Sequence, residues 1–317
     1  MTELVTFGET MLRLSPPSGD RLETATALEF RTAGAESNVA IAAARLGASS
    51  VWLSKLPESP LGRRVTNEVR QHGVEPRIEW DDGARQGAYY IEHGSTPRPT
   101  MIIYDRADAA ITTARPTDQY REAIQQASVF YTSGITPALS ETLDETTREL
   151  LATAQGAGTT TVFDLNYRSK LWPPAEARKT YESLFERIDI LVAAERDVDI
   201  VLDRQGPAEE LAESLAADFS FETVIITRGA DGALAVHEGS TYEQPAFKTD
   251  TVDAIGTGDA FAGGYLARYV AGDTVSEALS YAAATAALKR TIEGDLAVVT
   301  PKEVEGVLDS EGRGISR

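Results

Sequence analysis

The chain has 317 residues, of which 42% are apolar, enough for one large core or a core with a small appended part. Its 49 acidic against 30 basic residues give a net charge of -19, which disfavours binding to nucleic acid or to an anionic membrane. The sequence contains no cysteine, so disulfides, thiolate zinc sites and cysteine nucleophiles are excluded. No apolar run approaches the roughly 18 residues of a membrane span, and the start lacks a leader pattern, so we expect a soluble, cytoplasmic protein.

The acidic surplus has two interpretations. Lysine occurs at only six positions, and arginine supplies the other basic residues. One hypothesis is a halophile's surface, on which carboxylates hold water in concentrated salt. The alternative is ordinary acidic drift in a protein from a low-salt environment.

Buried strands are predicted by apolar or β-branched runs at 4–8, 50–56, 127–134, 159–166, 189–194 and 223–229. Most of the segments between them have helical periodicity, for example SNVAIAAARLG and TLDETTRELLATAQG. This alternation predicts βαβ units, and therefore an α/β fold with a doubly wound, mostly parallel sheet covered by helices on both faces.

Two segments break this alternation and predict a small β lid. They are GETMLRLSP, with a strand near residues 9–16, and the hairpin pattern RQGAYYIEHGSTPRPTMIIYDR at 85–106. A two-stranded hairpin is marginally stable alone, so we expect it to lie over the cleft at the strand ends or to pair with another chain. We expect one domain over residues 1–308, and a frayed polar tail at 309–317.

The segment DAIGTGDAFAGGYLA contains the main candidate site. Gly256 and Gly258 can turn successive N–H groups inward, and the helix that follows adds unpaired N–H groups and a positive dipole end. Together these groups predict an anion hole, with Asp259 ionised beside it and able to accept a proton. The alternative is that Asp259 is only an N-cap. The glycine-containing turn before it and the small residues after it favour the ligand-binding interpretation.

Three further segments are candidates. After the run at 159–166, Asp164, Asn166 and Arg168 alternate, so they would point to one side if the strand continues. In TRGADGA, Gly229 and Gly232 flank a turn that, on its residues alone, is best interpreted as a plain hairpin turn. In AGAESNVAIAAARLG a glycine turn precedes an alanine-rich helix. Walker, GxSxG and HExxH motifs are absent, the three histidines are scattered, and a complete dinucleotide fingerprint is missing.

These four segments, in this order, resemble those of the PfkB sugar kinase family, which has the ribokinase-like fold. AGAESNVAIAAARLG is similar to the family's N-terminal signature and DAIGTGDAFAGGYLA to its C-terminal one. Within the family, FGETMLRLSP, YDRADAAI, SGITPALS and DLNYRSKLW look most like segments of 2-keto-3-deoxygluconate kinases. The resemblance implies ATP- and Mg²⁺-dependent phosphorylation of the 6-hydroxyl of 2-keto-3-deoxygluconate, or of its galactonate epimer.

The resemblance also implies roles for individual residues. Asp259 would be the general base, and the N–H groups of Gly256, Thr257 and Gly258 would form the anion hole. The implied sugar-binding residues are Gly34, Tyr89, Tyr104, Arg106, Arg168, Asp259 and Asp295, with the two arginines suited to a carboxylate. The implied nucleotide-binding residues are Asn166, Arg168, Thr227, Arg228, Gly229, Gly232, Gly256 and Gly258. Tyr89 and Tyr104 could instead be lid packing or a dimer contact.

The sequence also departs from the family pattern. The family's usual Asn is absent from AAERD, and Asp197 stands in place of Glu, so we name no Mg²⁺ ligand. Pro57 and Ala33 replace common glycines. Two alternatives stay open: another PfkB kinase, acting on fructose, a fructose phosphate or a nucleoside, and a non-catalytic sugar or nucleotide binder. A lid hairpin that pairs across a two-fold axis favours a homo-oligomer.

Overall fold

The computed structural model describes residues 2–312, and its main feature is a sheet of nine strands within that part of the chain. The order is β13-β12-β11-β10-β9-β8-β1-β4-β5. Its strands are β1 (Leu4–Phe7), β4 (Ser50–Pro57), β5 (Glu75–Asp81), β8 (Val129–Ser133), β9 (Thr160–Asp164), β10 (Ile190–Ala194), β11 (Thr223–Thr227), β12 (Ala233–His237) and β13 (Ser240–Gln244). Pairing is parallel from β5 to β11 and antiparallel among β11, β12 and β13. The predicted α/β fold with a mostly parallel sheet is confirmed.

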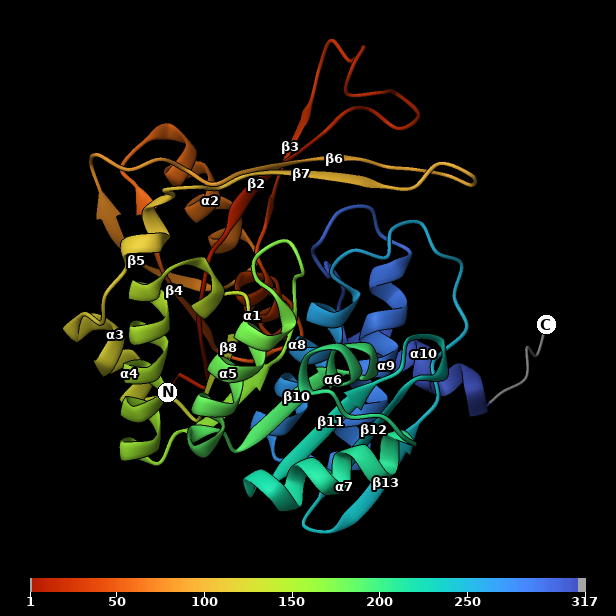
Figure 1. Cartoon of the computed structure of the whole chain (residues 1–317). Helices are drawn as coiled ribbons and strands as arrows, with labels where there is room; N and C mark the ends of the chain where they lie inside the picture. The colour runs from red at the N-terminus through yellow and green to blue at the C-terminus, as the bar shows by residue number, and fades with distance from the viewer. Residues whose placement is uncertain (1, 313–317) are drawn as a thin grey trace.

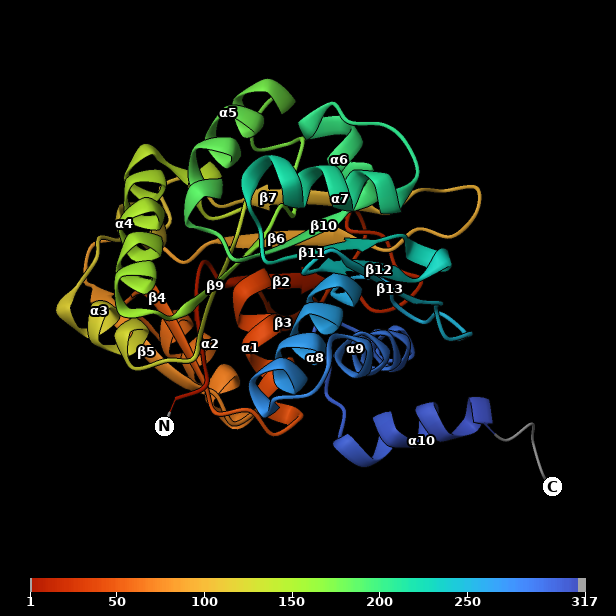
Figure 2. The ribbon, with the colours of Figure 1, turned by 90° about the horizontal axis from the view of Figure 1, so that it is seen from below.

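Helices cover both faces of this sheet (Figure 2). One face packs against α3 (Asp118–Gln125), α4 (Glu141–Ala157), α5 (Pro174–Leu184), α6 (Glu195–Leu202) and α7 (Ala208–Phe219). The other packs against α1 (Ala35–Arg45), α8 (Thr257–Ala271), α9 (Val275–Arg290) and α10 (Pro301–Gly312), while α2 (Pro60–Gln71) lies beside β4 and β5. No helix among residues 2–312 is long and apolar enough to cross a membrane.

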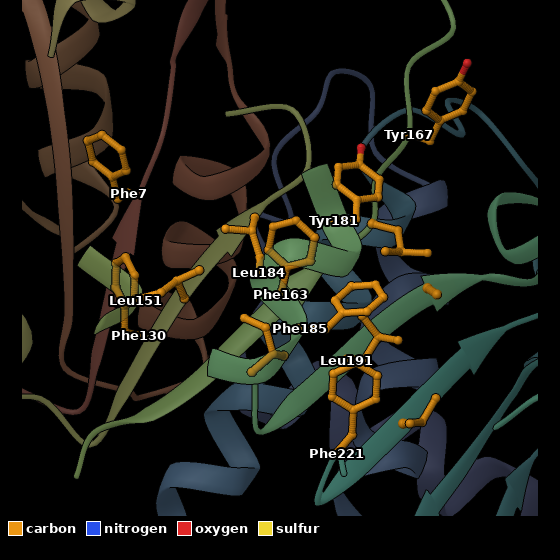
Figure 3. Packing of buried hydrophobic residues seen from close by; sticks show 14 of the residues in the cluster. Phe7, Phe130, Leu151, Phe163, Tyr167, Tyr181, Leu184, Phe185, Leu191 and Phe221 are labelled. Atoms are coloured by element: carbon orange, nitrogen blue, oxygen red, sulfur yellow. The ribbon is translucent and has the colours of Figure 1, made fainter. Parts of the chain in front are cut away.

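The first core is rich in aromatic side chains, and Figure 3 shows several of them from close by, among them Phe163, Phe185 and Phe221. Phe163 on β9 meets the ring of Tyr181 edge to face, and Phe185 meets Phe221 in the same way. Such pairs add about 0.5–1.5 kcal/mol each beyond their buried area. The second core is instead alanine-rich, and small side chains bring α8 close to α1 and α9. This close packing fixes the position of the α8 N-terminus relative to the sheet.

A second, four-stranded sheet lies across the end of the molecule (Figure 1). Its order is β3-β2-β6-β7, with β2 (Met11–Ser15), β3 (Glu29–Ala33), β6 (Ala88–Glu92) and β7 (Met101–Asp105). We call this sheet the lid. The strands expected near 9–16 and 85–106 correspond to β2, β6 and β7, whereas β3 was not predicted because EFRTA is short and two of its five residues are charged.

Of the tail predicted at 309–317, residues 309–312 form the end of α10 and residues 313–317 lie outside the described part, so its fraying stays a prediction. One sequence prediction is wrong in detail. The strand at 159–166 does not continue to Asn166: β9 ends at Asp164, and Asn166 has a φ of 37°. The chain therefore turns after Asp164, and the alternation that would have placed Asn166 and Arg168 on its side of a strand is lost.

Candidate active site

A cavity of about 1130 Å³ lies between the lid and the carboxyl ends of the central strands. Asp164 on β9, Ala194 on β10 and Thr227 on β11 line it from the sheet, and the start of α8 lines it from below. In open α/β sheets this edge is where ligands bind. The predicted site residues that line this cavity are Gly34, Tyr89, Tyr104, Arg106, Asn166, Arg168, Thr227, Gly256, Thr257, Gly258, Asp259 and Asp295.

A second cavity of about 430 Å³ adjoins the first. Arg228, Gly229 and Gly232 line it together with Phe247 and alanines of α9. The two cavities share Ala194, Arg196, Thr227, Thr257 and Gly258 as lining residues. The N-terminus of α8 therefore stands between a larger chamber under the lid and a smaller chamber beside α9.

The turn before α8 depends on Gly256. This residue is the N-cap of the helix and has a φ of 77°, a backbone conformation that L side chains rarely adopt. A Cβ atom here would also lie 2.0 Å from the carbonyl oxygen of Asp295. The N–H of Thr257 donates to the carbonyl of Ala254 at 3.3 Å. The sequence predicts an anion hole of three N–H groups. In the structure the N–H of Thr257 is already bonded, so it could join the other two only by giving up this bond.

Asp259 lies in the first turn of α8 and faces the cavity. It is not the N-cap, a position held by Gly256, so the alternative of a plain N-cap is wrong. The amide Nδ2 of Asn38 on α1 donates to Oδ2 of Asp259 at 2.7 Å. Burial raises the pKa of Asp259 to about 6, and the bond from Asn38 opposes that rise. The carboxylate is therefore both held in place and tuned toward neutral pH, as a general base requires.

Two further buried carboxyl groups lie nearby. Burial raises the pKa of Asp164 to about 7, and the negative charges of Asp259 and Asp197 add to the rise. Burial likewise raises the pKa of Glu36 to about 7, although its Oε1 accepts bonds from Ser133 and Thr136. Glu36 and Asn38 were missed from the sequence because the small residues of the helix that carries them suggested only close backbone approach or tight helix packing. A cavity with this many carboxyl groups favours a cation or a phosphate with its counterion.

Under the lid, Arg106 and Arg13 are held by acidic partners. Arg106 forms an ion pair with Glu9, and its guanidinium lies 5.6 Å from the ring centroid of Tyr104. The hydroxyl of Tyr89 donates to Asp295 at 3.0 Å. Asp295 also pairs with the buried Arg13 of β2.

The same arginine joins the lid to the turn before α8. Arg13 pairs with Asp253 at 3.1 Å, and Asp253 accepts a bond from the N–H of Ile255 at 3.0 Å. Lys289 donates to the carbonyl of Asp253 at 3.0 Å. Arg13, Asp253 and Lys289 were not predicted, because partners that are 240 and 36 positions apart along the chain meet only in the folded protein.

The residues expected at the nucleotide are divided between the two cavities, and Thr227 and Gly258 line both. Gly229 and Gly232 are in the turn between β11 and β12, where Arg228 N–H donates to the Gly232 carbonyl at 2.7 Å, so this is a hairpin turn as its residues indicated. Arg228 pairs with Glu243 at 2.7 Å. The Nδ2 group of Asn166 is buried and has no hydrogen-bond partner among the described residues. This unpaired donor faces a cavity that can supply an acceptor.

Comparison with known proteins agrees with this geometry. The model of the pfkB family carbohydrate kinases matches residues 1–302. The chain belongs to the PfkB family. It is 69% identical to a 2-dehydro-3-deoxygalactonokinase of Haloferax volcanii over 315 residues, which cover 99% of each chain. This PfkB protein is accordingly a carbohydrate kinase.

Two more relatives of this PfkB kinase carry related names. A 2-dehydro-3-deoxygluconokinase of Thermoproteus tenax is 31% identical, with 97% of this chain and 94% of the relative covered. The crystal structure of a 2-dehydro-3-deoxygluconokinase from Thermotoga maritima superposes with a TM-score of 0.90 at 33% identity, covering 97% and 98% of the two chains. The prefixes 2-dehydro and 2-keto describe the same sugar acids.

PfkB kinases work with Mg²⁺, and the donor set of the site fits such an ion. Residues 2–312 contain no group of three Asp, Glu or His side chains close enough to hold a metal by themselves. Mg²⁺ usually binds through one or two carboxylates, waters and substrate phosphates. Asp164 is such a carboxylate; burial raises its pKa, and the negative charges of Asp259 and Asp197, which add to that rise, are charges that a cation would offset. We therefore expect Asp164 to hold the ion together with the nucleotide.

Proposed function

We propose that this kinase transfers the γ-phosphoryl group of ATP to the 6-hydroxyl of a 2-keto-3-deoxy sugar acid, either the gluconate or its galactonate epimer. The observation that carries the proposal is the meeting of the two cavities at the start of α8, with Asp259 on the lid side. A triphosphate in the smaller cavity would reach the start of α8 with its terminal phosphate. A sugar under the lid would then present its hydroxyl to that phosphate.

The chain's own groups suit phosphoryl transfer, which is mostly positioning and charge stabilisation. Asp259 accepts the proton of the 6-hydroxyl as the sugar oxygen forms its bond to the γ-phosphorus and the bond from that phosphorus to ADP breaks. The N–H groups of Gly256 and Gly258 face the charge on the transferred oxygens. Mg²⁺, when bound, neutralises part of the phosphate charge.

The choice of a sugar acid rests on the cations around Tyr104 and on the relatives. Arg106 lies against this ring inside the cavity, where a guanidinium can bind a carboxylate through two parallel bonds. The relatives from three organisms are named for 2-dehydro-3-deoxy sugar acids. A neutral sugar has no carboxylate with which to bind these cations.

A substrate panel tests the proposal. The purified protein is assayed with ATP and Mg²⁺ in high salt on 2-keto-3-deoxygluconate, 2-keto-3-deoxygalactonate, fructose, fructose 1-phosphate, fructose 6-phosphate and ribose. We expect kcat/KM to be highest for one or both sugar acids, with the 6-phosphate as product. Phosphorylation of fructose or a fructose phosphate alone would overturn the proposal in favour of another PfkB activity, and ligand binding without turnover would favour a silent binder.

A further inference from the structure

The charges at the lid end of the cavity do not all remain available to a substrate. Arg106 is ion-paired with Glu9, so its positive charge is already compensated. Arg168 lies toward the reaction centre, where its charge lowers the pKa values that burial raises at Asp164 and Asp259. A sugar carboxylate that reaches the lid therefore needs a further positive group.

Lys170 meets this need. It lines the same cavity, and its Nζ lies 5.6 Å from the ring centroid of Tyr104, the ring that Arg106 also approaches. Among the described residues, the ion pairs of this strongly acidic chain leave Lys170 without a carboxylate partner. Its Nζ donates instead to the backbone carbonyl of Ile102 on β7, at 2.7 Å.

The segment 166–173 that carries Lys170 is well fixed at its base. Asp197 on α6 accepts a bond from the N–H of Tyr167 at 3.2 Å. The hydroxyl of Tyr167 donates to the carbonyl of Trp172 at 3.0 Å, which closes the segment on itself. Lys170 at its exposed tip is thus held at the mouth of the cavity, while its long side chain keeps its own freedom to turn.

We propose that Lys170 is the specificity-determining residue that selects an acid over a neutral sugar, by binding the carboxylate of the substrate. The inference rests on the proposed function and deepens it. An ammonium has three donors, so one can stay on the Ile102 carbonyl while another meets the carboxylate. The sugar acid is then held between Lys170 and Arg106 across the Tyr104 ring, and a neutral sugar gains nothing from the ammonium.

The test compares an acid with a neutral analogue. Wild type and Lys170→Met are assayed with the preferred 2-keto-3-deoxy sugar acid and with the matching 3-deoxyketohexose, which has a hydroxymethyl group in place of the carboxylate. Lost charge-assisted bonds of this kind weaken affinity by about tenfold or more, so the KM of the acid should rise by that factor with kcat nearly unchanged. The KM of the neutral sugar, or its Ki as a competitor, should stay within about twofold.

Matched variants separate this role from others. Lys179→Met removes the same charge from the exposed side of α5 and should leave both sugars unaffected, while Lys170→Arg should retain most of the preference for the acid. Equal losses for both sugars in Lys170→Met would show that the residue only holds the lid, and would overturn the proposal. Wild type that phosphorylates no sugar acid would instead overturn the proposed function itself.

Discussion

At the scale of single residues, Asp259 is the group on which the proposed chemistry depends. Asp259→Asn keeps the shape of the side chain and its place beside Asn38 but removes the proton acceptor. We expect kcat to fall about 100-fold or more, the usual range for a lost general base, while ATP affinity changes only a few-fold. Steady-state kinetics and direct binding of ATP check the two effects separately. Unchanged turnover in this variant would contradict the assignment of the base.

The pH profile gives an independent check on Asp259. A base acts only when deprotonated, and the pKa of Asp259 is raised to about 6 by burial, so kcat/KM should fall as the pH drops through about 6. The bond from Asn38 lowers this pKa. Asn38→Leu, which is of similar size but cannot donate, should therefore move the acid limb of the profile to higher pH, whatever it does to the maximal rate. A limb that stays in place would show that another group controls it.

The sequence supported some site residues better than others for a physical reason. In DAIGTGDAF the glycines and the aspartates predict the local backbone conformation and charge by themselves, so a turn and a helix start were predictable there. Whether Asp259 caps the helix or faces a cavity depends on Asn38 and on the lid, which lie far away in the chain. The pairing of Arg106 with Glu9 could not be predicted from the sequence either, because nothing in the sequence near one residue specifies the other.

At the scale of elements, the start of α8 is specified by backbone geometry. Gly256→Ala would combine a positive φ, which costs about 1–3 kcal/mol for most residues, with a Cβ atom 2.0 Å from the Asp295 carbonyl oxygen. We expect a lower free energy of unfolding and a large loss of kcat. Gly258→Ala is the matched control, since a Cβ there meets no atom within 4 Å and the variant should fold normally. Chemical denaturation of both proteins measures the difference, and equal stabilities would contradict the argument.

A second prediction at this scale is that the lid sheet associates with another copy of the chain. Ile102 and Tyr104 line the cavity, so the alternating residues of β7 face away from it, and Met101 and Ile103 are 51% and 49% exposed. Phe30 on β3 is 48% exposed. We expect these apolar side chains to be covered in a homo-oligomer.

Ile103→Asp tests this expectation. The substitution places a charge in the exposed apolar face of the lid and should shift the protein toward monomers in sedimentation velocity at micromolar concentration. Val298→Asp, at an exposed apolar position outside the lid, should leave the assembly unchanged. A wild type that sediments as a monomer would contradict the prediction.

The elements that sequence patterns missed have a common cause. The buried parallel strands have continuous apolar sequences, and β1, β4 and β10 lie where such runs predict them. The edge strand β5 and the lid strand β3 carry charged residues because one side or one edge is solvated, so their sequences resemble loops. Their strand character comes from neighbours: β5 pairs with β4 along its whole length, and β3 pairs with β2.

At the scale of the whole molecule, two separate hydrophobic cores hold the helices on the two faces of the sheet. The aromatic core fixes α3 to α7 on one face, and the alanine-rich core fixes α1, α8 and α9 on the other. The proposed general base Asp259 and its hydrogen-bond partner Asn38 come from the second set, since they belong to α8 and α1. The lid joins this half through Arg13, which meets Asp253 and Asp295. Buried charges thereby connect the lid to the turn before α8.

The net charge of -19 makes a prediction for the molecule as a whole. In dilute buffer this charge repels itself over a Debye length of about 30 Å at 0.01 M salt, which shrinks to about 3 Å at 1 M. If the acidic surface is a halophile's, the melting midpoint and the activity should both rise as KCl increases from dilute to molar concentration. Few of the surface carboxylates can be neutralised by a lysine, since the chain contains only six lysines.

The measurement is a thermal unfolding series in KCl, with activity assayed at each concentration and the ATP and Mg²⁺ levels held constant. A neutral osmolyte such as sucrose serves as the control, because it favours compact states without screening charge. Stabilisation by KCl that exceeds the effect of sucrose would support a surface adapted to salt. A sharp transition and full activity in dilute buffer, unimproved by molar KCl, would instead identify the acidic surplus as ordinary drift, since the self-repulsion would then cost the folded protein little.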